Sequence, residues 1–160
     1  KVLFIRFLKN EVSGELHILD QIPEIEVFHL QKSFGFYNTL SAEEKRLAEV
    51  VYGKLWNTAI EKAASESYDL LVMDEFMAAY NYGLIPHPEA LKFLKEKPEG
   101  LEVVLTGRNP SETLIEVADY VSEIQKIKHP FDQNIKLTIQ PSARFYPRGT
   151  VFAKQPNYGC

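Results

Sequence analysis

Short apolar runs that alternate with helix-like segments limit the possible folds of this sequence more than any other feature. The strand candidates are residues 1–9, 26–30, 70–73, 101–107 and 119–128. Most are separated by helix-like segments, and strands joined through such crossovers run parallel. Residues 103–105 are apolar on both faces, as expected where helices cover both sides of a parallel sheet. The sequence therefore predicts an α/β domain with a mainly parallel sheet.

Three helices are predicted between these strands. The longest covers residues 42–65, where Ser41 and Glu44 form a capping-box pattern and apolar residues follow at helical spacing. A second, shorter helix is expected after the prolines of the sequence IPHPEA. A third is expected to have Asn109 as its N-cap and Pro110 as its first residue.

The chain is predicted to form one domain with a distinct tail. Its length of 160 residues fits a single domain. Residues 10–20 and 31–40 are predicted loops. Residues 1–136 carry the strand and helix pattern, whereas residues 137–160 are rich in Pro, Gly, Tyr and Arg without periodicity. We expect this tail to be extended or irregular.

Composition excludes several classes of function. The formal charge of −4 argues against general nucleic-acid binding, although a nucleotide site needs only local positive charge. The single cysteine, Cys160, permits no internal disulfide and fits a reducing compartment. No membrane span or signal peptide is predicted, so a cytoplasmic location is expected. The chain starts at Lys1, directly in a strand-like run, which predicts that it is a fragment of a longer protein.

Two adjacent carboxylates end the third strand candidate. Residues 70–73 are apolar and run directly into Asp74 and Glu75. Ligands of open α/β sheets bind beyond the carboxyl ends of the strands. Paired carboxylates there can hold Mg²⁺, directly or through water, as in the Walker B strand of P-loop nucleotide enzymes. The alternative is that the two acids only cap the next helix, since acids favour a helix N-terminus.

Polar residues also end the last two strand candidates. Thr106 offers a hydroxyl and Arg108 can bind a phosphate through two parallel hydrogen bonds, which predicts contacts to a nucleotide. A plain turn with a solvated arginine is the alternative. Lys128 and His129 follow the last strand, where the histidine either orients a ligand or has a structural role. No metal-binding His or Cys cluster and no serine or cysteine nucleophile pattern is found.

Four segments together resemble a known family. RFLK, VMDEFMAAYNYGLI, LEVVLTGRNP and ADYVSEIQKIKHPFD, in this order and spacing, resemble the ATP:corrinoid adenosyltransferases of the CobA/CobO/BtuR type. The similarity extends from Lys1 to about Lys136, and the ordered set is specific although no single motif is. It implies a three-layer RecA-like P-loop NTPase fold with a mainly parallel sheet, usually assembled as a homodimer.

The resemblance also implies an activity. The family transfers the 5′-deoxyadenosyl group of ATP to the cobalt of cob(I)alamin or another corrinoid, and triphosphate leaves. The reaction belongs to cobalamin biosynthesis, requires Mg²⁺, and implies a flavin-type reductase as the source of electrons. Because cobalt is itself the nucleophile, no nucleophilic side chain is needed, in agreement with the lack of such a pattern.

Residue roles follow from the same resemblance. Glu75 is the implied magnesium ligand and catalytic residue, with Asp74 beside it. The implied contacts to the nucleotide come from Thr106, Arg108, Lys128 and His129.

An aromatic loop is implied to bind the corrinoid. The family has Gly-Phe-Thr-Trp where this chain has Gly35-Phe36-Tyr37-Asn38. Phe36 carries over, and Tyr37 could compensate for the tryptophan that Asn38 replaces. Apolar side chains near the lower face of the corrinoid would favour a four-coordinate Co(II), which is easier to reduce. The alternative is that these aromatic residues only pack the loop onto the sheet.

The chain departs from the family at its N-terminus. It has no Gly-rich P-loop: the only Gly-Lys pair, Gly53-Lys54, lies inside the predicted long helix and is followed by Leu55 instead of Ser or Thr. The first strand and the P-loop are therefore expected upstream of Lys1, which predicts either a gap in the sheet or a need for a partner segment. If the complete protein lacks them, the alternative is a non-catalytic corrinoid- or partner-binding module. A further alternative is another P-loop ATPase of similar fold, in which Asp74 and Glu75 serve hydrolysis.

Overall fold

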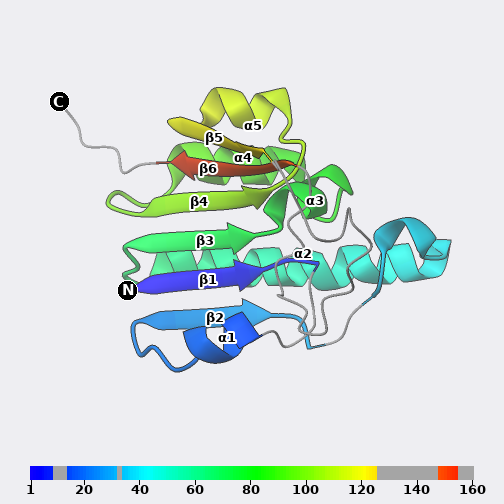
Figure 1. Ribbon diagram of the computed structural model, residues 1–160, viewed down its shortest axis with the longest axis horizontal. Coiled ribbons are helices and arrows are strands. Elements are labelled where there is room, and N and C mark those ends of the chain that lie inside the picture. Colours follow the sequence, from blue (N-terminus) through cyan, green and yellow to red (C-terminus); the bar gives the residue numbers. More distant parts are fainter. Residues whose placement is uncertain (9–13, 32–33, 126–147, 155–160) are drawn as a thin grey trace.

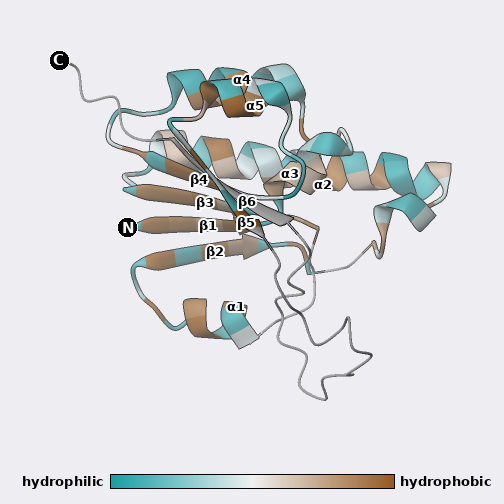
Figure 2. Cartoon of the chain, turned by 45° about the horizontal axis from the view of Figure 1, so that its top comes forward, coloured by the Kyte–Doolittle hydropathy of each residue, from teal (hydrophilic) through white to brown (hydrophobic). Residues whose placement is uncertain are grey.

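The computed structural model describes residues 1–8, 14–31, 34–125 and 148–154, which form a six-stranded sheet with helices on both sides (Figures 1 and 2). The strands are β1 (Val2–Arg6), β2 (Ile25–His29), β3 (Leu70–Asp74), β4 (Glu102–Gly107), β5 (Tyr120–Gln125) and β6 (Arg148–Lys154). The helices are α1 (Gly14–Leu19), α2 (Ala42–Ser65), α3 (Phe76–Asn81), α4 (His87–Glu96) and α5 (Glu112–Val117), with a 3-10 turn at Tyr37–Thr39.

Four strands form the parallel part of the sheet. The strand order is β2-β1-β3-β4-β6-β5, and β2, β1, β3 and β4 all pair in parallel. The predicted α/β class with a mainly parallel sheet is therefore confirmed. The carboxyl ends of these strands meet at one edge, called the carboxyl margin below. The opposite edge is called the amino margin.

One face of the parallel strands carries the core. Alternate side chains of β1, β3 and β4 are fully buried on this face; they are Leu3, Ile5, Leu71, Met73, Val103 and Leu105, each 0% exposed. The helix α2 packs over them with Tyr52, Trp56 and Ala59. Figure 2 shows α2, α4 and α5 on one side of the sheet and α1 on the other.

The predicted boundaries of α2 are confirmed. Ser41 is its N-cap and accepts a hydrogen bond from the Glu44 amide, while the Glu44 carboxylate accepts one from the Ser41 amide, so the capping box forms. Gly53 and Lys54 lie inside this helix, as predicted. In the part of the chain that the structure describes, no helix is both long enough and apolar enough to cross a bilayer.

Three helical features differ from the prediction. A loop was expected where α1 forms, and α3 was not predicted; each is six residues long, too short for helical periodicity to show. The N-cap of α5 is Ser111, whose hydroxyl accepts from the Leu114 amide at 3.3 Å. Asn109 instead has a left-handed backbone, so the predicted cap at Asn109 and Pro110 is wrong.

A strand from the tail lies inside the sheet. β6 pairs antiparallel with both β4 and β5, for example Thr106 with Val151 and Val121 with Phe152. The tail is therefore extended at residues 148–154, which is one of the two expected forms. The described strands form one continuous sheet, so the expected gap is not found among them. An antiparallel strand can satisfy the hydrogen-bonding groups of β4 as a parallel one would.

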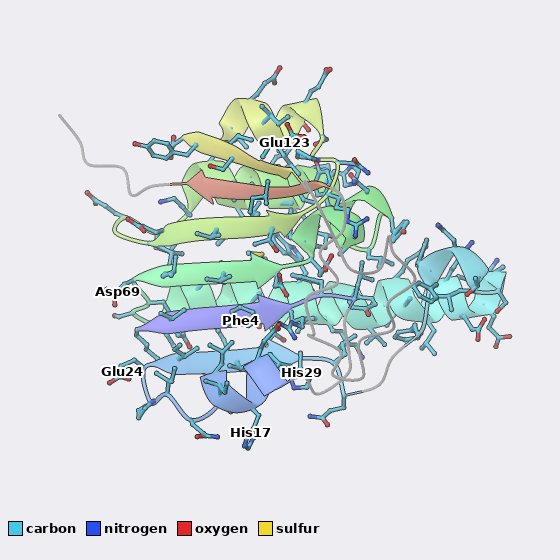
Figure 3. All side chains as sticks on the ribbon, in the orientation of Figure 1. Phe4, His17, Glu24, His29, Asp69 and Glu123 are labelled. Carbon is cyan, nitrogen blue, oxygen red and sulfur yellow. The ribbon has the colours of Figure 1, made fainter. Side chains whose placement is uncertain are left out.

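The amino margin carries a network of exposed charges, on the side where Figure 3 labels Glu24 and Asp69. The Lys62 ammonium lies 2.6 Å from Glu66 Oε1 and 3.0 Å from Glu26 Oε1. The Tyr68 hydroxyl lies between the same two carboxylates. Hydrogen bonds from Lys62, then from Lys1 and Tyr68, lower the pKa of Glu66 to about 2. Burial, with the neighbouring carboxylates, raises the pKa of Tyr68 to about 12.

Candidate functional site

Strained backbone collects at the carboxyl margin. Among the described residues, the non-glycine residues with positive φ are Leu8 (58°), Glu75 (59°) and Asn109 (53°). They follow the ends of β1, β3 and β4, three adjacent strands of the sheet. Left-handed non-glycine residues cost energy and occur preferentially at binding and catalytic sites. This margin is therefore the candidate site, in the place where ligands of open α/β sheets bind.

Asp74 is the centre of a hydrogen-bond network that joins three strands. Its Oδ1 accepts from the Thr106 hydroxyl of β4 at 2.7 Å, and its Oδ2 accepts from Nε of Arg6 of β1 at 3.0 Å. Asp74 itself ends β3 and is partly buried. The structure thus brings together Asp74 and Thr106, two residues that the sequence analysis placed at separate strand ends.

Glu75 continues this network through its backbone. Its amide donates to the Thr106 hydroxyl at 3.2 Å, so Thr106 bridges the two acidic residues. Glu75 occupies the N-cap position of α3, but its side chain makes no capping hydrogen bond. Glu75 therefore lies at the helix N-terminus, as the capping alternative requires, but without the side-chain hydrogen bond of a cap.

Arg6 belongs to the site and was not predicted. It is 3% exposed, and its Nη2 donates to Glu15 Oε2 of α1 at 2.7 Å. The signal available in the sequence was a basic residue inside an otherwise apolar strand candidate. Its partner could not be read from the sequence, because it depends on the register that places Arg6 beside Asp74.

The helix α3 connects the acidic residues to two neighbouring loops. Asn81, its last residue, donates to the Asn109 carbonyl oxygen at 2.9 Å and so fixes the turn that contains Arg108. Arg108 is half-buried, and its Nη2 atom is buried, which differs from a fully solvated side chain. Tyr82, directly after α3, stacks on Tyr37 with ring centroids 4.3 Å apart.

The two aromatic residues of the predicted corrinoid loop differ in environment. Tyr37 is half-buried against Tyr82, and its hydroxyl donates to the Tyr82 carbonyl oxygen at 3.4 Å. Phe36 is 67% exposed, so it does not pack the loop onto the sheet. In Figure 1 this loop precedes α2 on the side of the sheet to which the arrowheads of β1, β3 and β4 point. The loop that carries Phe36 therefore lies on the same side of the molecule as the carboxyl margin.

The chemistry of the donor set fits a hard divalent cation. Asp74, Glu75 and Thr106 offer carboxylate and hydroxyl oxygens, which are the ligands that Mg²⁺ prefers. Among the described residues, no group of three or more His, Cys, Asp or Glu side chains could hold a metal on its own. Mg²⁺ needs no such group, because nucleotide phosphates and water supply most of its ligands. Lys128 and His129 lie outside the described residues.

The fold and this margin together define an α/β protein with an acidic, oxygen-rich site at the carboxyl ends of a parallel sheet. Residues 1–139 match the family described as ATP:corrinoid adenosyltransferase BtuR/CobO/CobP. The chain belongs to this family. The strand β6 lies outside the matched residues.

Individual relatives agree with this assignment. The chain is similar to a corrinoid adenosyltransferase of Sinorhizobium sp, with 36% identity over 136 residues, covering 82% of this chain and 62% of the relative. A corrinoid adenosyltransferase of Escherichia coli K12 is 31% identical over 142 residues, covering 87% of this chain and 69% of the relative. A corrinoid adenosyltransferase CobA of Salmonella typhimurium LT2 is 33% identical over 135 residues, covering 82% of this chain and 65% of the relative. The chain thus spans somewhat under two thirds of the first of these relatives.

Proposed function

We propose that this chain is the larger part of an ATP:cob(I)alamin adenosyltransferase. Such an enzyme transfers the 5′-deoxyadenosyl group of ATP to the cobalt of a reduced corrinoid and releases triphosphate. The observation that carries the proposal is the hydrogen-bonded group of Asp74, Thr106 and the Glu75 amide at the carboxyl margin. Membership of the family supplies the reaction class.

The reaction requires positioning and charge neutralisation. The bond that forms joins C5′ of ATP to cobalt, and the bond that breaks joins C5′ to its oxygen. The electron pair of the broken bond leaves with triphosphate. The protein must hold C5′ in line with cobalt and stabilise the departing polyanion. No nucleophilic side chain is required, because the corrinoid substrate supplies the attacking electron pair.

Glu75 and Asp74 are proposed to hold Mg²⁺ on the nucleotide. When bound, Mg²⁺ would neutralise negative charge on the triphosphate. Glu75 would be the main ligand, as the resemblance to the family implies, with Asp74 beside it. Thr106 and Arg6 orient the two carboxylate oxygens of Asp74, which could bind the ion directly or through water. Arg108 would donate hydrogen bonds to the phosphates, and Lys128 and His129 are proposed to contact the same nucleotide.

Phe36 is proposed to contact the corrinoid. Its exposure leaves the ring available to a flat macrocycle, and the stacked pair of Tyr37 and Tyr82 gives its loop a rigid base. An apolar ring on the lower face would disfavour an axial ligand of cobalt. Co(II) without that ligand is easier to reduce, so Phe36 would assist formation of the Co(I) nucleophile.

The wider setting of the enzyme is part of the proposal. The complete protein would have a RecA-like P-loop fold, with the phosphate-binding loop supplied by residues outside this chain. It would act as a cytoplasmic homodimer in cobalamin biosynthesis, receiving electrons from a flavin-type reductase. Residues 1–136 would form the adenosyltransferase domain, and residues 137–160 would be an addition to it.

A transfer assay tests the function. The full-length protein is incubated with ATP, Mg²⁺ and chemically reduced cob(I)alamin, and both products are measured. Adenosylcobalamin and triphosphate formed in equal amounts support the proposal. Release of phosphate without a corrinoid product would indicate an ATPase instead. Corrinoid binding without affinity for a magnesium nucleotide would indicate a non-catalytic binding module.

A further inference from the structure

Arg6 occupies an unusual place for a charged residue. It ends β1 between apolar neighbours, is 3% exposed, and stands in register with Asp74 on the adjacent strand. Its Nε donates to Asp74 Oδ2 at 3.0 Å, and its Nη2 donates to Glu15 Oε2 at 2.7 Å. One buried guanidinium therefore joins the acidic end of β3 to α1.

Stability alone does not account for this arginine. Burying a guanidinium loses its hydration, and this loss offsets most of the attraction to the carboxylates. An apolar side chain of similar volume would fill the same space without that cost. What an arginine adds is direction, because its planar group presents donors at fixed angles to two acceptors.

The direction matters because Asp74 is held from both sides. Thr106 donates to one carboxylate oxygen and Arg6 to the other, so rotation of the Asp74 side chain would break a hydrogen bond. With its proton committed to Asp74, the Thr106 hydroxyl accepts from the Glu75 amide at 3.2 Å. The left-handed backbone of Glu75, at φ 59°, is thus tied to Arg6 through two intermediate residues.

We propose that Arg6 is a positioning residue of the site. Through Asp74 and Thr106 it holds the backbone of Glu75, and so sets the affinity of the protein for a magnesium nucleotide. The identity of the ligand, a magnesium nucleotide, is taken from the proposed function. The hydrogen-bond chain does not rest on that function, because it is formed entirely by residues of this protein, and the two can therefore be tested separately.

Nuclear magnetic resonance of the ligand-free, full-length protein tests the hydrogen-bond chain. Arg6→Met removes the donors while nearly keeping the volume, and Arg6→Lys keeps the charge with a single donor group. Both should shift the amide resonance of Glu75, the methionine variant more. Lys62→Gln is the matched control, because it breaks an ion-pair network at the amino margin and should leave that resonance in place. An unshifted Glu75 resonance in folded Arg6→Met overturns the inference.

Calorimetry with Mg²⁺ and ATP tests the consequence for binding. Partners that orient metal ligands typically contribute about 10- to 100-fold in affinity, so Arg6→Met should weaken binding by about this factor and Arg6→Lys by less. Lys62→Gln should bind as the wild type does. Wild-type affinity in folded Arg6→Met would overturn the inference. If Arg6→Met does not fold, wild-type affinity in folded Arg6→Lys would overturn it instead. A wild type that binds no nucleotide would refute the proposed function instead, and the Glu75 resonance would still decide whether Arg6 positions it.

Discussion

The two margins of the parallel sheet use similar charged residues in different ways. At the amino margin, Lys62 pairs with Glu26 and Glu66, and these side chains are 23%, 34% and 37% exposed. At the carboxyl margin, the Arg6 side chain is 4% exposed, and its partners Asp74 and Glu15 are 26% and 43% exposed. Left-handed residues follow the strands only at the carboxyl margin among the described residues.

This difference separates charges that add to stability from charges that fix geometry. Exposed pairs are screened by water and can exchange partners, so each contributes little. A buried pair with full hydrogen bonding holds its groups in one arrangement and is sensitive to the loss of either partner. The network at the carboxyl margin is closer to the second kind, because its arginine is buried while Asp74 is partly buried. Substitutions at the two margins should therefore give different results.

The largest expected effect is on catalysis, at Glu75. Glu75→Gln removes the charge of the proposed magnesium ligand and should lower turnover by about 100-fold with the fold intact, judged by circular dichroism. Glu66→Gln, the same substitution at the amino margin, is the matched control and should keep full turnover. Equal activity of the two variants would remove the proposed role of Glu75.

The second effect concerns the fit of α3 against β4. A Cβ on Gly107 would lie 2.6 Å from Met77 Cβ, and Gly107 has φ 141°, which disfavours other residues. Gly107→Ala should lower the free energy of unfolding by about 1–3 kcal/mol in urea titrations. Gly53→Ala is the control: apart from its chain neighbours and the nearby backbone of α2, no atom lies within 4 Å of the added group, and alanine in α2 should stabilise by about 0.5–1 kcal/mol. If both substitutions changed the free energy of unfolding in the same direction, the close contact between Gly107 and Met77 would be contradicted.

The third effect is specific to the cobalt oxidation state. If Phe36 disfavours the axial ligand, Phe36→Ala should reduce turnover with cob(II)alamin and a reductant by up to about tenfold, the range of one aromatic contact. Turnover with chemically prepared cob(I)alamin should change less. An equal loss with both substrates would show that Phe36 only binds the corrinoid.

The smallest effect is on the pH dependence of stability, at the amino margin. The pKa of Glu66 is lowered from 4.5 to about 2 in the folded protein, first by Lys62. A lowered carboxyl pKa contributes stability that is fully present above pH 4.5 and is lost as the pH falls toward 2. Lys62→Gln should reduce the free energy of unfolding near neutral pH and have less effect at about pH 2. A pH-independent difference from the wild type would contradict this account.

Much of the fold could be predicted from the sequence. Apolar strand candidates separated by helix-like segments predicted the α/β class. The capping box at Ser41 predicted the start of α2. The short helices α1 and α3 could not be predicted, because six residues hold less than two turns of periodicity. The entry of β6 between β4 and β5 also depends on pairing across the sheet.

The candidate site could be predicted only in part. The acids and Thr106 were visible because each ends an apolar run, and parallel strands bring such ends together. Arg6 and Asn81 could not be predicted as site residues, because their hydrogen-bond partners, Asp74 and Asn109, lie 68 and 28 positions away along the chain. Strand register and the packing of α3 decide those contacts, and neither has a local sequence signal.

The position of β6 decides which strand of the sheet is open to pairing with another chain. Were the sheet to stop at β4, the amides and carbonyls on one side of this strand would be left open to pair with any other extended chain. Residues 148–154 occupy that side instead, and β5, a strand whose side chains at 120–124 are exposed, becomes the outermost one. A segment outside the family match thus moves the open side of the sheet from β4 to β5, where Tyr120, Val121 and Ile124 are exposed. Another extended chain could pair with the sheet on that side only at β5.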